Sequence, residues 1–232
     1  MSIVENIARI RERVGAAARR AGRNPAEIEL MGVSKTHPPE RIREAYAAGL
    51  RLFGENRVQE FAGKAPALGA LAGAEWHLIG HLQSNKAIKT AQLFSAVDSV
   101  DSSKLAQKLN IAAEQAGKKL AVLIEINIAG EDAKSGVAPR SEELENLLSG
   151  APQWEQLSIR GLMAIPPFTE DAQQARPYFK KLRELRDEIA ARKLPSVSMD
   201  VLSMGMSHDF EVAIEEGSTC VRVGTAIFGQ RG

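Results

Sequence analysis

Residues 30–38 read LMGVSKTHP, an apolar run that ends in a lysine and a proline-containing turn. The run begins at Ile28 and predicts a buried strand over residues 29–34. Lys35 then lies at the end of that strand, where partial loss of solvent disfavours the ammonium form of a lysine. A neutral amine is the form that condenses with a carbonyl compound to give a Schiff base. The alternative is a lysine that reaches water along its own stem, and the rest of the chain decides between the two.

Seven further apolar runs follow the first, and helical patterns or loops separate them. Strands that alternate with helices form a parallel sheet with right-handed crossovers. Eight of them in about 200 residues predict an α/β fold of the (β/α)8 TIM-barrel type, with residues 1–232 as a single domain. A doubly wound open sheet is the alternative, and the absence of a Gly-x-Gly-x-x-Gly motif after the first strand disfavours it. The predicted strands cover residues 29–34, 51–54, 76–80, 93–97, 120–126, 159–163, 197–202 and 220–223.

An extra helix over residues 3–21 precedes the barrel, because Ile3, Ile7, Ile10 and Val14 form one apolar stripe. Its arginines cover the other faces, which predicts a solvated helix surface rather than a binding face for nucleic acid. The remaining helices are predicted near residues 38–49, 58–71, 84–90, 101–117, 139–150, 171–192 and 207–216.

The composition is that of a soluble globular protein, with 44% hydrophobic and 25% charged residues. A net charge of +1 gives no electrostatic reason to expect nucleic acid or an acidic membrane as a partner. The single cysteine, Cys220, excludes an internal disulfide and is predicted to be a buried, unreactive thiol. The N-terminus lacks the pattern of a secretory signal, and the scattered histidines do not suggest a metal site. We therefore expect a cytoplasmic, monomeric protein without a bound metal.

Two loops at the predicted strand ends have the composition of anion-binding turns. Residues 203–207 read SMGMS, where Gly205 lets backbone amides approach a ligand and Ser207 is predicted to cap the next helix. Gly224 and Thr225 open the last helical turn. Amides at helix starts bind phosphate, and the loops after the seventh and eighth strands are its usual position in this fold. Turn-forming residues alone are the alternative for each loop, but their occurrence in both favours phosphate.

Arg222 lies in an otherwise apolar strand, and no carboxylate near it in sequence offers a partner. The ring nitrogen of a cofactor is therefore a credible partner. A lysine for an aldehyde, two loops for a phosphate and an arginine for a ring nitrogen together describe pyridoxal 5′-phosphate. The other polar residues at predicted strand ends are Glu55, Asn56, His81, Gln83, Asp98 and Asn127.

Seven motifs carry a resemblance to a known family. They read VSKTHP (33–38), FGENRVQE (53–60), WHLIGHLQSNK (76–86), INIAGEDAKSG (126–136), RGLMAI (160–165), LSMGMSHDFEVAI (202–214) and VRVGTAIFG (221–229). In this order they span nearly the whole chain, which resembles the YggS/PROSC family of pyridoxal phosphate homeostasis proteins. The barrel of that family is similar to the N-terminal domain of alanine racemase, so the resemblance implies a fold-type III barrel that binds pyridoxal phosphate.

The resemblance also implies roles for individual residues. Lys35 would hold the cofactor as an aldimine, Arg222 would face its pyridine nitrogen and Asn56 would lie near its ring. His81 would border the pocket, together with Asn85 and Lys86. The residues expected to line the phosphate are Ser203, Met204, Gly205, Gly224 and Thr225. The resemblance assigns no role to His37, because members of the family often carry a different residue at this position. Local sequence predicts a packing role for His77.

Two functions are compatible with such a site. The resemblance implies a protein that buffers pyridoxal phosphate and delivers it to apoenzymes through transient contacts. Its other expected partners are amino acids, and it has no established reaction of its own. The alternative is an amino-acid racemase or a related fold-type III enzyme, which needs a base on each face of its substrate. Alanine racemases bring a tyrosine from a second domain, whereas Tyr46 and Tyr178 fall within predicted helices. An arginine at the ring nitrogen also weakens the cofactor as an electron sink. We therefore predict a carrier.

Overall fold

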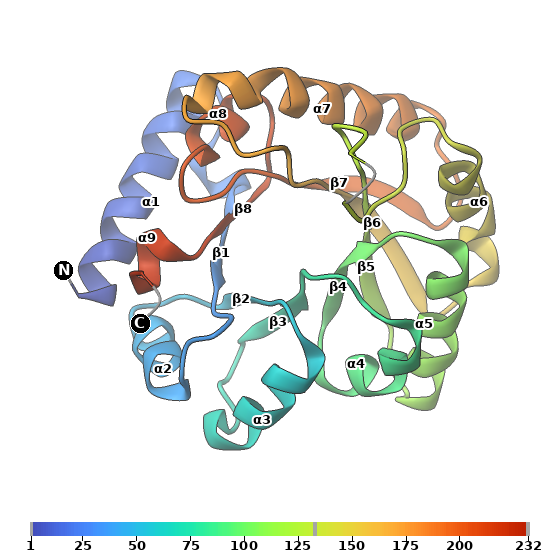
Figure 1. Ribbon diagram of the computed structural model, residues 1–232, viewed down its shortest axis with the longest axis horizontal. Coiled ribbons are helices and arrows are strands. Elements are labelled where there is room, and N and C mark those ends of the chain that lie inside the picture. Colours follow the sequence, from blue (N-terminus) through green and yellow to red (C-terminus); the bar gives the residue numbers. More distant parts are fainter. Residues whose placement is uncertain (1, 132–133, 231–232) are drawn as a thin grey trace.

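Eight parallel strands form a closed barrel at the centre of the computed structural model, which describes residues 2–131 and 134–230 (Figure 1). The strands are β1 (Glu29–Val33), β2 (Leu52–Glu55), β3 (Glu75–Leu78), β4 (Ala96–Val100), β5 (Leu120–Glu125), β6 (Leu157–Met163), β7 (Val197–Ser203) and β8 (Cys220–Val223). Each strand pairs with the next, and β8 closes the barrel against β1, with Met31 beside Arg222 and Gly32 beside Val223. The predicted (β/α)8 barrel is therefore confirmed.

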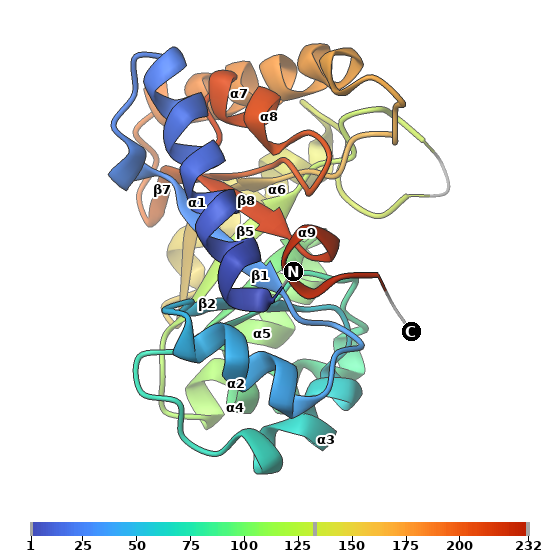
Figure 2. The same cartoon turned by 90° about the vertical axis from the view of Figure 1, so that its left-hand side faces the viewer.

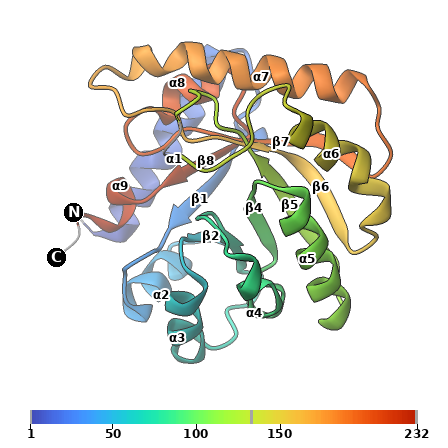
Figure 3. The ribbon, with the colours of Figure 1, turned by 45° about the vertical axis from the view of Figure 1, so that its right-hand side comes forward.

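Helices connect the strands and cover the outside of the barrel, and Figure 3 shows α5 and α6 beside β5 and β6. The α-helices are α1 (Ile3–Arg20), α2 (Pro39–Ala47), α3 (Val58–Leu68), α4 (Ala87–Leu93), α5 (Ser103–Gln115), α6 (Glu142–Gly150), α7 (Arg176–Ala191), α8 (Phe210–Glu215) and α9 (Thr225–Phe228). Short 3-10 helices cover Pro25–Glu27, Ser84–Lys86, Ala151–Gln153 and Ala172–Ala175.

The N-terminal helix α1 packs beside the closing strand pair, against α8 and α9 (Figure 2). The side-chain amide of Asn6 donates a hydrogen bond to the carbonyl oxygen of Ile227 in α9 at 2.9 Å. Arg13, which the sequence places on a solvated surface, forms an ion pair with Glu211 of α8 at 3.1 Å. The extra helix therefore covers the side of the barrel where α9 supplies only four residues.

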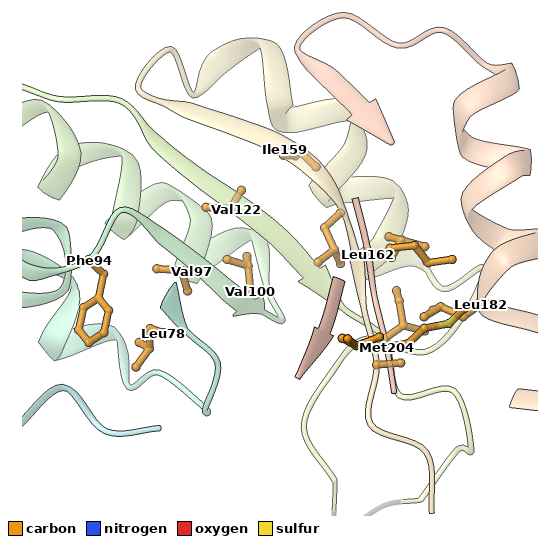
Figure 4. Packing of buried hydrophobic residues seen from close by; sticks show 14 of the residues in the cluster. Leu78, Phe94, Val97, Val100, Val122, Ile159, Leu162, Leu182 and Met204 are labelled. Atoms are coloured by element: carbon orange, nitrogen blue, oxygen red, sulfur yellow. The ribbon is translucent and has the colours of Figure 1, made fainter. Parts of the chain in front are cut away.

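Two groups of buried apolar side chains stabilise the barrel. The larger lies between the strands and the helices, and includes Val97 and Val122 from strands, Leu182 from α7 and Met204 after β7 (Figure 4). A smaller cluster lies inside the barrel. Side chains alternate along a strand, so neighbouring residues of a strand such as β1 face the inside and the outside of the barrel in turn. The interior cluster consists of Met31, Val33, Ile79 and Cys220, with Leu52 and Val201 packed against it.

The fourth strand lies further along the chain than predicted. The prediction covers residues 93–97, whereas Leu93 ends α4 and β4 begins at Ala96. Phe94, which separates the two elements, is fully buried and packs against Phe61 of α3, with ring centroids 4.9 Å apart. Leu93 and Phe94 therefore belong to a helix end and its packing contact, whereas Ala96 and Val97 lie in β4 as predicted.

The eighth helix is shorter than predicted. The prediction starts it at Ser207, whereas α8 starts at Phe210 and its N-cap position is occupied by Asp209. The side chain of Asp209 makes no capping hydrogen bond to α8. Its Oδ1 accepts a hydrogen bond from the N–H of Met206 at 2.6 Å, in the turn before the helix. Because α8 starts after this turn, Ser207 lies outside the helix and its side chain contacts another part of the chain.

Candidate functional site

Lys35 follows β1 at the carboxyl end of the barrel, two residues after Val33, whose side chain belongs to the interior cluster. The residue is half-buried. Its neighbour Thr36 has a φ of 66°, in the left-handed region that a threonine rarely adopts. The backbone therefore turns directly after the lysine and holds it at the barrel mouth.

Asn56 follows β2 in the same way, and a glycine makes room for it. A Cβ atom at Gly80 would lie 2.4 Å from the carbonyl oxygen of Asn56 and 2.9 Å from its Cγ atom. The hydroxyl of Ser99 donates to the carbonyl oxygen of Gly80 at 2.7 Å and holds the turn from the other side. Gly80 therefore sets the position of Asn56. A glycine at a strand end is the sequence signal that could have identified this close approach.

Arg222 is buried in the barrel, and both terminal nitrogens of its guanidinium group are fixed. Nη1 donates to Ser203 Oγ at 2.7 Å, and Nη2 donates to the carbonyl oxygen of Ala164 at 2.9 Å. Burial lowers the pKa of Arg222, while nearby acidic groups, Asp98 and Glu125 among them, act in the opposite direction. Two neutral partners on neighbouring strands thus hold a buried cation in one orientation.

One hydroxyl group joins the two predicted phosphate loops. Ser207 Oγ accepts hydrogen bonds from the N–H groups of Gly224 at 3.3 Å and Ala226 at 3.4 Å. Ser207 therefore binds amides at the start of α9 and does not cap α8 as predicted. Because α8 and α9 have only six and four residues, the donors here are individual amides rather than the dipole of a long helix. The two amides converge on a single oxygen atom, here the neutral hydroxyl of Ser207, and convergent backbone amides are the donors that an anion site uses.

The two glycines of these loops, Gly205 and Gly224, have different structural roles. Gly205 has a φ of 90°, and a Cβ atom there would lie 2.5 Å from the Cβ of Ala213 and 2.9 Å from the Cα of Phe210. Packing against α8 therefore requires this glycine. A Cβ atom at Gly224 would be 3.5 Å from the Cβ of Val33. The β8 loop thus lies directly beside the strand that leads to Lys35.

Ser203 and Met204 are fully buried and have other partners. The hydroxyl of Ser203 accepts the hydrogen bond from Arg222, and its carbonyl oxygen accepts one from the N–H of Ala164 at 3.2 Å. The side chain of Met204 lies in the core outside the barrel (Figure 4). Their contact with a phosphate stays a prediction.

Glu125, the last residue of β5, is a buried acid that the sequence analysis does not single out. It is 6% exposed, and its Oε1 accepts a hydrogen bond from Ser135 Oγ at 3.0 Å. Burial raises the pKa of Glu125, and the hydrogen bond from Ser135 offsets only part of this effect. In the closed barrel β5 is four strands from β1 in either direction. Glu125 and Lys35 therefore end strands on opposite sides of the mouth.

A surface pocket beside the mouth is lined by Asn56, His81 and Lys86, among others. His81 is largely exposed, and its Nδ1 lies 3.2 Å from Asp101 Oδ2. The structure thus brings together three residues that the family motifs place near the site. Asn127, also at a predicted strand end, instead organises its own loop, because its Oδ1 accepts the N–H groups of Gly130 and Glu131 at 3.0 and 3.2 Å.

His37, which has no predicted role, stacks on Phe228 of α9. The ring centroids are 4.8 Å apart and the planes differ by 24°. The contact joins the loop after β1 to the helix after β8, the two segments that carry Lys35 and the converging amides.

His77 and Asp98 form an ion pair inside the barrel, which corrects the prediction that Asp98 lies at a strand end. Asp98 lies within β4, is 1% exposed, and its Oδ1 is 3.0 Å from His77 Nδ1. Burial disfavours the charged imidazole, but Asp98 and Glu75 outweigh burial and raise the pKa of His77 to about 10. The prediction for Cys220 is confirmed, because the thiol is buried and burial raises its pKa to about 12.

Among the residues that the structure describes, no group of three or more His, Cys, Asp or Glu side chains could hold a metal ion. In the same part of the chain, every helix is too short or too polar to cross a bilayer.

A closed parallel barrel with polar residues gathered at its carboxyl end is the architecture of the alanine racemase barrel. The family model described as "Alanine racemase, N-terminal domain" matches residues 5–232. An alanine racemase from Clostridium difficile has the same fold, with a TM-score of 0.72 at 16% identity over 99% of this chain and 56% of that one. The chain therefore belongs to the alanine racemase N-terminal domain family.

Two more similar proteins define where in this family the chain lies. It is 47% identical over 231 residues to the "Pyridoxal phosphate homeostasis protein" of Aquifex aeolicus, covering 100% of this chain and 99% of that protein. The solved structure of PipY from Synechococcus elongatus, with PLP bound, has a TM-score of 0.82 and 38% identity over 98% of this chain and 100% of that one. The similarity predicted from the sequence motifs is thus confirmed.

Proposed function

We propose that this protein binds pyridoxal phosphate at the carboxyl end of its barrel and holds the cofactor for delivery inside the cell. The observation that carries the proposal is the position of Gly224 beside Val33. Pairing of β8 with β1 sets converging amides next to the strand end that bears Lys35. One ligand with a phosphate and an aldehyde can therefore engage both strands. The name of the Aquifex relative and the PLP-bound PipY structure support this assignment.

The residues at the mouth suit this cofactor. Bound pyridoxal phosphate supplies an aldehyde, with which a lysine amine condenses with loss of water. In this proposal Lys35 provides that amine, Asn56 lies near the ring and Arg222 faces the ring nitrogen. An arginine keeps its proton and donates it in a hydrogen bond, so the ring nitrogen stays unprotonated. The residues proposed to line the phosphate are Ser203, Met204, Gly205, Gly224 and Thr225.

Storage and delivery are favoured over racemisation because both tyrosines of the sequence lie in helices outside the barrel. Tyr46 lies in α2, where its hydroxyl donates to the carbonyl oxygen of Ala72 at 2.9 Å, and Tyr178 lies in α7, packed against the outer core. Racemisation needs proton exchange on both faces of the substrate carbon. We therefore propose a monomeric carrier that passes its cofactor to apoenzymes through transient contacts.

The experiment is covalent trapping of the bound cofactor. Purified protein is mixed with pyridoxal phosphate, its visible spectrum is recorded, and the complex is reduced with borohydride and mapped by peptide mass spectrometry. The adduct is expected on Lys35. The variant Lys35→Ala is expected to keep the circular dichroism of the folded protein and to lose both the yellow absorbance and the adduct. An adduct on Lys86 or Lys134 would contradict the assignment.

A further inference from the structure

The turn that bears Lys35 is bound on its N-terminal side to a buried carboxylate. Glu55 ends β2, its side chain is 0% exposed, and its Oε1 accepts a hydrogen bond from Ser34 Oγ at 2.7 Å. Lys64 of α3 binds the same carboxylate, with Nζ 2.8 Å from Oε1 and 2.9 Å from Oε2. The Nζ of Lys64 also donates to the carbonyl oxygen of Ser34 at 3.2 Å. The residue before Lys35 is thus held by both its side chain and its backbone.

The residue after Lys35 is bound to the same group of side chains. Glu60 Oε1 accepts the N–H of Thr36 at 2.5 Å and a hydrogen bond from Lys64 Nζ at 2.9 Å. Thr36 is the residue with a φ of 66°, a conformation that costs free energy for a β-branched side chain and persists only when its surroundings impose it. Glu60 therefore stabilises the turn at Thr36, where the backbone is strained.

The charges of this group strengthen its contacts. Burial raises the pKa of Glu55, and the contacts with Lys64 and Ser34 act against that rise. Burial also disfavours the ionised form of Glu60, but the hydrogen bonds from Lys64 and Thr36 outweigh it and lower the pKa of Glu60. One ammonium group, 11% exposed, thus bridges two carboxylates. Hydrogen bonds to charged groups are stronger and more directional than those between neutral groups.

We propose that Glu55, Glu60 and Lys64 are positioning residues that hold residues 34–36 so that the amine of Lys35 meets an aldehyde in the barrel mouth. This inference rests on the proposed function, because it needs Lys35 to be the residue that binds the cofactor. None of the three side chains has to touch the ligand. They act through the backbone on both sides of Lys35, and misplacement of a reacting group by about 1 Å costs on the order of a hundredfold in rate.

Glu60 is the residue to change, because removal of Lys64 would leave the carboxylate of Glu55 buried without its cation and could unfold the protein. Glu60→Ala removes the acceptor for the N–H of Thr36 and leaves the pair of Glu55 and Lys64 intact. Glu60→Gln retains an acceptor oxygen and tests for rescue. Glu142→Ala is the control matched in helix position, because Glu142 lies in the first turn of α6 as Glu60 lies in the first turn of α3. Glu142 is exposed, whereas Glu60 is half-buried.

Two measurements follow these variants in the full-length protein. The first is the rate at which pyridoxal phosphate becomes trapped on Lys35 by borohydride, as a function of pH. Glu60→Ala is expected to be slower by roughly tenfold to a hundredfold, with Glu60→Gln close to the unchanged protein and Glu142→Ala indistinguishable from it. The second is amide hydrogen exchange of Thr36 without ligand, which is expected to accelerate in Glu60→Ala only.

The outcomes separate the two claims. If the unchanged protein forms no adduct on Lys35, the proposed function fails and this inference fails with it. If the adduct forms on Lys35 at the same rate in Glu60→Ala as in the unchanged protein, the inference alone is overturned. Equal slowing in Glu142→Ala also overturns it, because the effect would then belong to any charge at a helix start.

Discussion

The Nδ1 atom of His77 lies 3.0 Å from Oδ1 of Asp98 inside the barrel, on adjacent strands β3 and β4. The residues around this pair line a cavity that includes Glu29, Glu75 and Cys220, which lie in the first half of their strands. The pair is therefore on the amino-terminal side of the interior, away from Lys35. The pair is therefore expected to contribute to stability.

This pair makes stability depend on pH in the alkaline range. The pKa of His77 is raised from 6.5 to about 10 in the folded protein, so its contribution is fully present below 6.5 and is lost as the pH rises through about 10. Asp98→Asn is expected to lower the free energy of unfolding at neutral pH by about 3–5 kcal/mol and to flatten the alkaline decline. Urea denaturation over this pH range measures both effects. An alkaline decline as steep in Asp98→Asn as in the unchanged protein would exclude the pair as its cause.

Thr225, exposed at the start of α9, tests the anion site. Loss of one hydrogen bond to a charged phosphate costs about 1.5–3 kcal/mol, so Thr225→Ala is expected to bind pyridoxal phosphate roughly ten- to a hundredfold more weakly. Pyridoxal, which lacks the phosphate, is the matched control ligand and is expected to bind both proteins equally. If Thr225→Ala weakens the binding of both ligands equally, the phosphate is bound at a place other than Thr225.

Gly205→Val is expected to lower the stability of the protein even when no ligand is bound. The new Cβ would lie 2.5 Å from the Cβ of Ala213, at a φ of 90°. Overpacking of this kind typically costs about 1–3 kcal/mol, and the backbone strain adds to it. A lower midpoint of thermal unfolding without ligand is the expected result. An unchanged midpoint would show that α8 moves aside freely.

Glu125→Gln is expected to stabilise the protein at neutral and alkaline pH. Because the folded pKa of Glu125 is raised above 4.5, its favourable contribution is present below 4.5 and is lost as the pH rises through the folded pKa. A neutral amide avoids that loss, with a gain of about 1–3 kcal/mol. Chemical denaturation at acidic and alkaline pH measures the difference, and Glu142→Gln on the surface of α6 is the control. A gain that is the same at every pH would argue against ionisation of Glu125 as the reason.

Deuterium exchange distinguishes the carrier from an enzyme. The loaded protein is incubated with L-alanine in deuterated water, and α-deuterium and D-alanine are measured. One positioned base typically contributes 10²–10⁴-fold, so a site without a base on each face is expected to stay near the rate of free pyridoxal phosphate. Turnover on the order of 1 s⁻¹ would identify an enzyme, and Glu125, across the mouth from Lys35, would be the first residue to change.

The strand ends could be predicted because they follow directly from local sequence. An apolar run followed by a polar residue located Lys35 and Asn56, since a barrel brings all carboxyl strand ends to one face. Arg222 was identified differently, as a charged residue within an otherwise apolar strand. The fourth strand could not be located in this way. Its polar residues Asp98 and Ser99 are paired inside the fold, with His77 and with the carbonyl oxygen of Gly80, so the strand does not read as an apolar run.

The residues that surround and hold the site were harder to predict than the site residues themselves. Glu125 stands at the end of an apolar strand and becomes notable only through its burial. Lys64 and Glu60 belong to a helix whose orientation toward β1 depends on tertiary packing, so their contacts with Ser34 and Thr36 have no signal in sequence. Ser207 resembles a helix cap, and only the approach of the β8 loop reveals its acceptor role.

The way in which the barrel closes has a consequence for how the chain is made. Both partners of the closing pair lie near the chain ends, and α1 depends on α9 for the contact between Asn6 and Ile227. During synthesis β1 is a strand edge with no neighbour on one side until Cys220–Val223 has left the ribosome. Contacts between residues so distant in sequence form slowly and leave apolar surface exposed in the meantime. We therefore expect the nascent chain to need chaperones until β8 is made, and a protein cut short before β8 to be degraded.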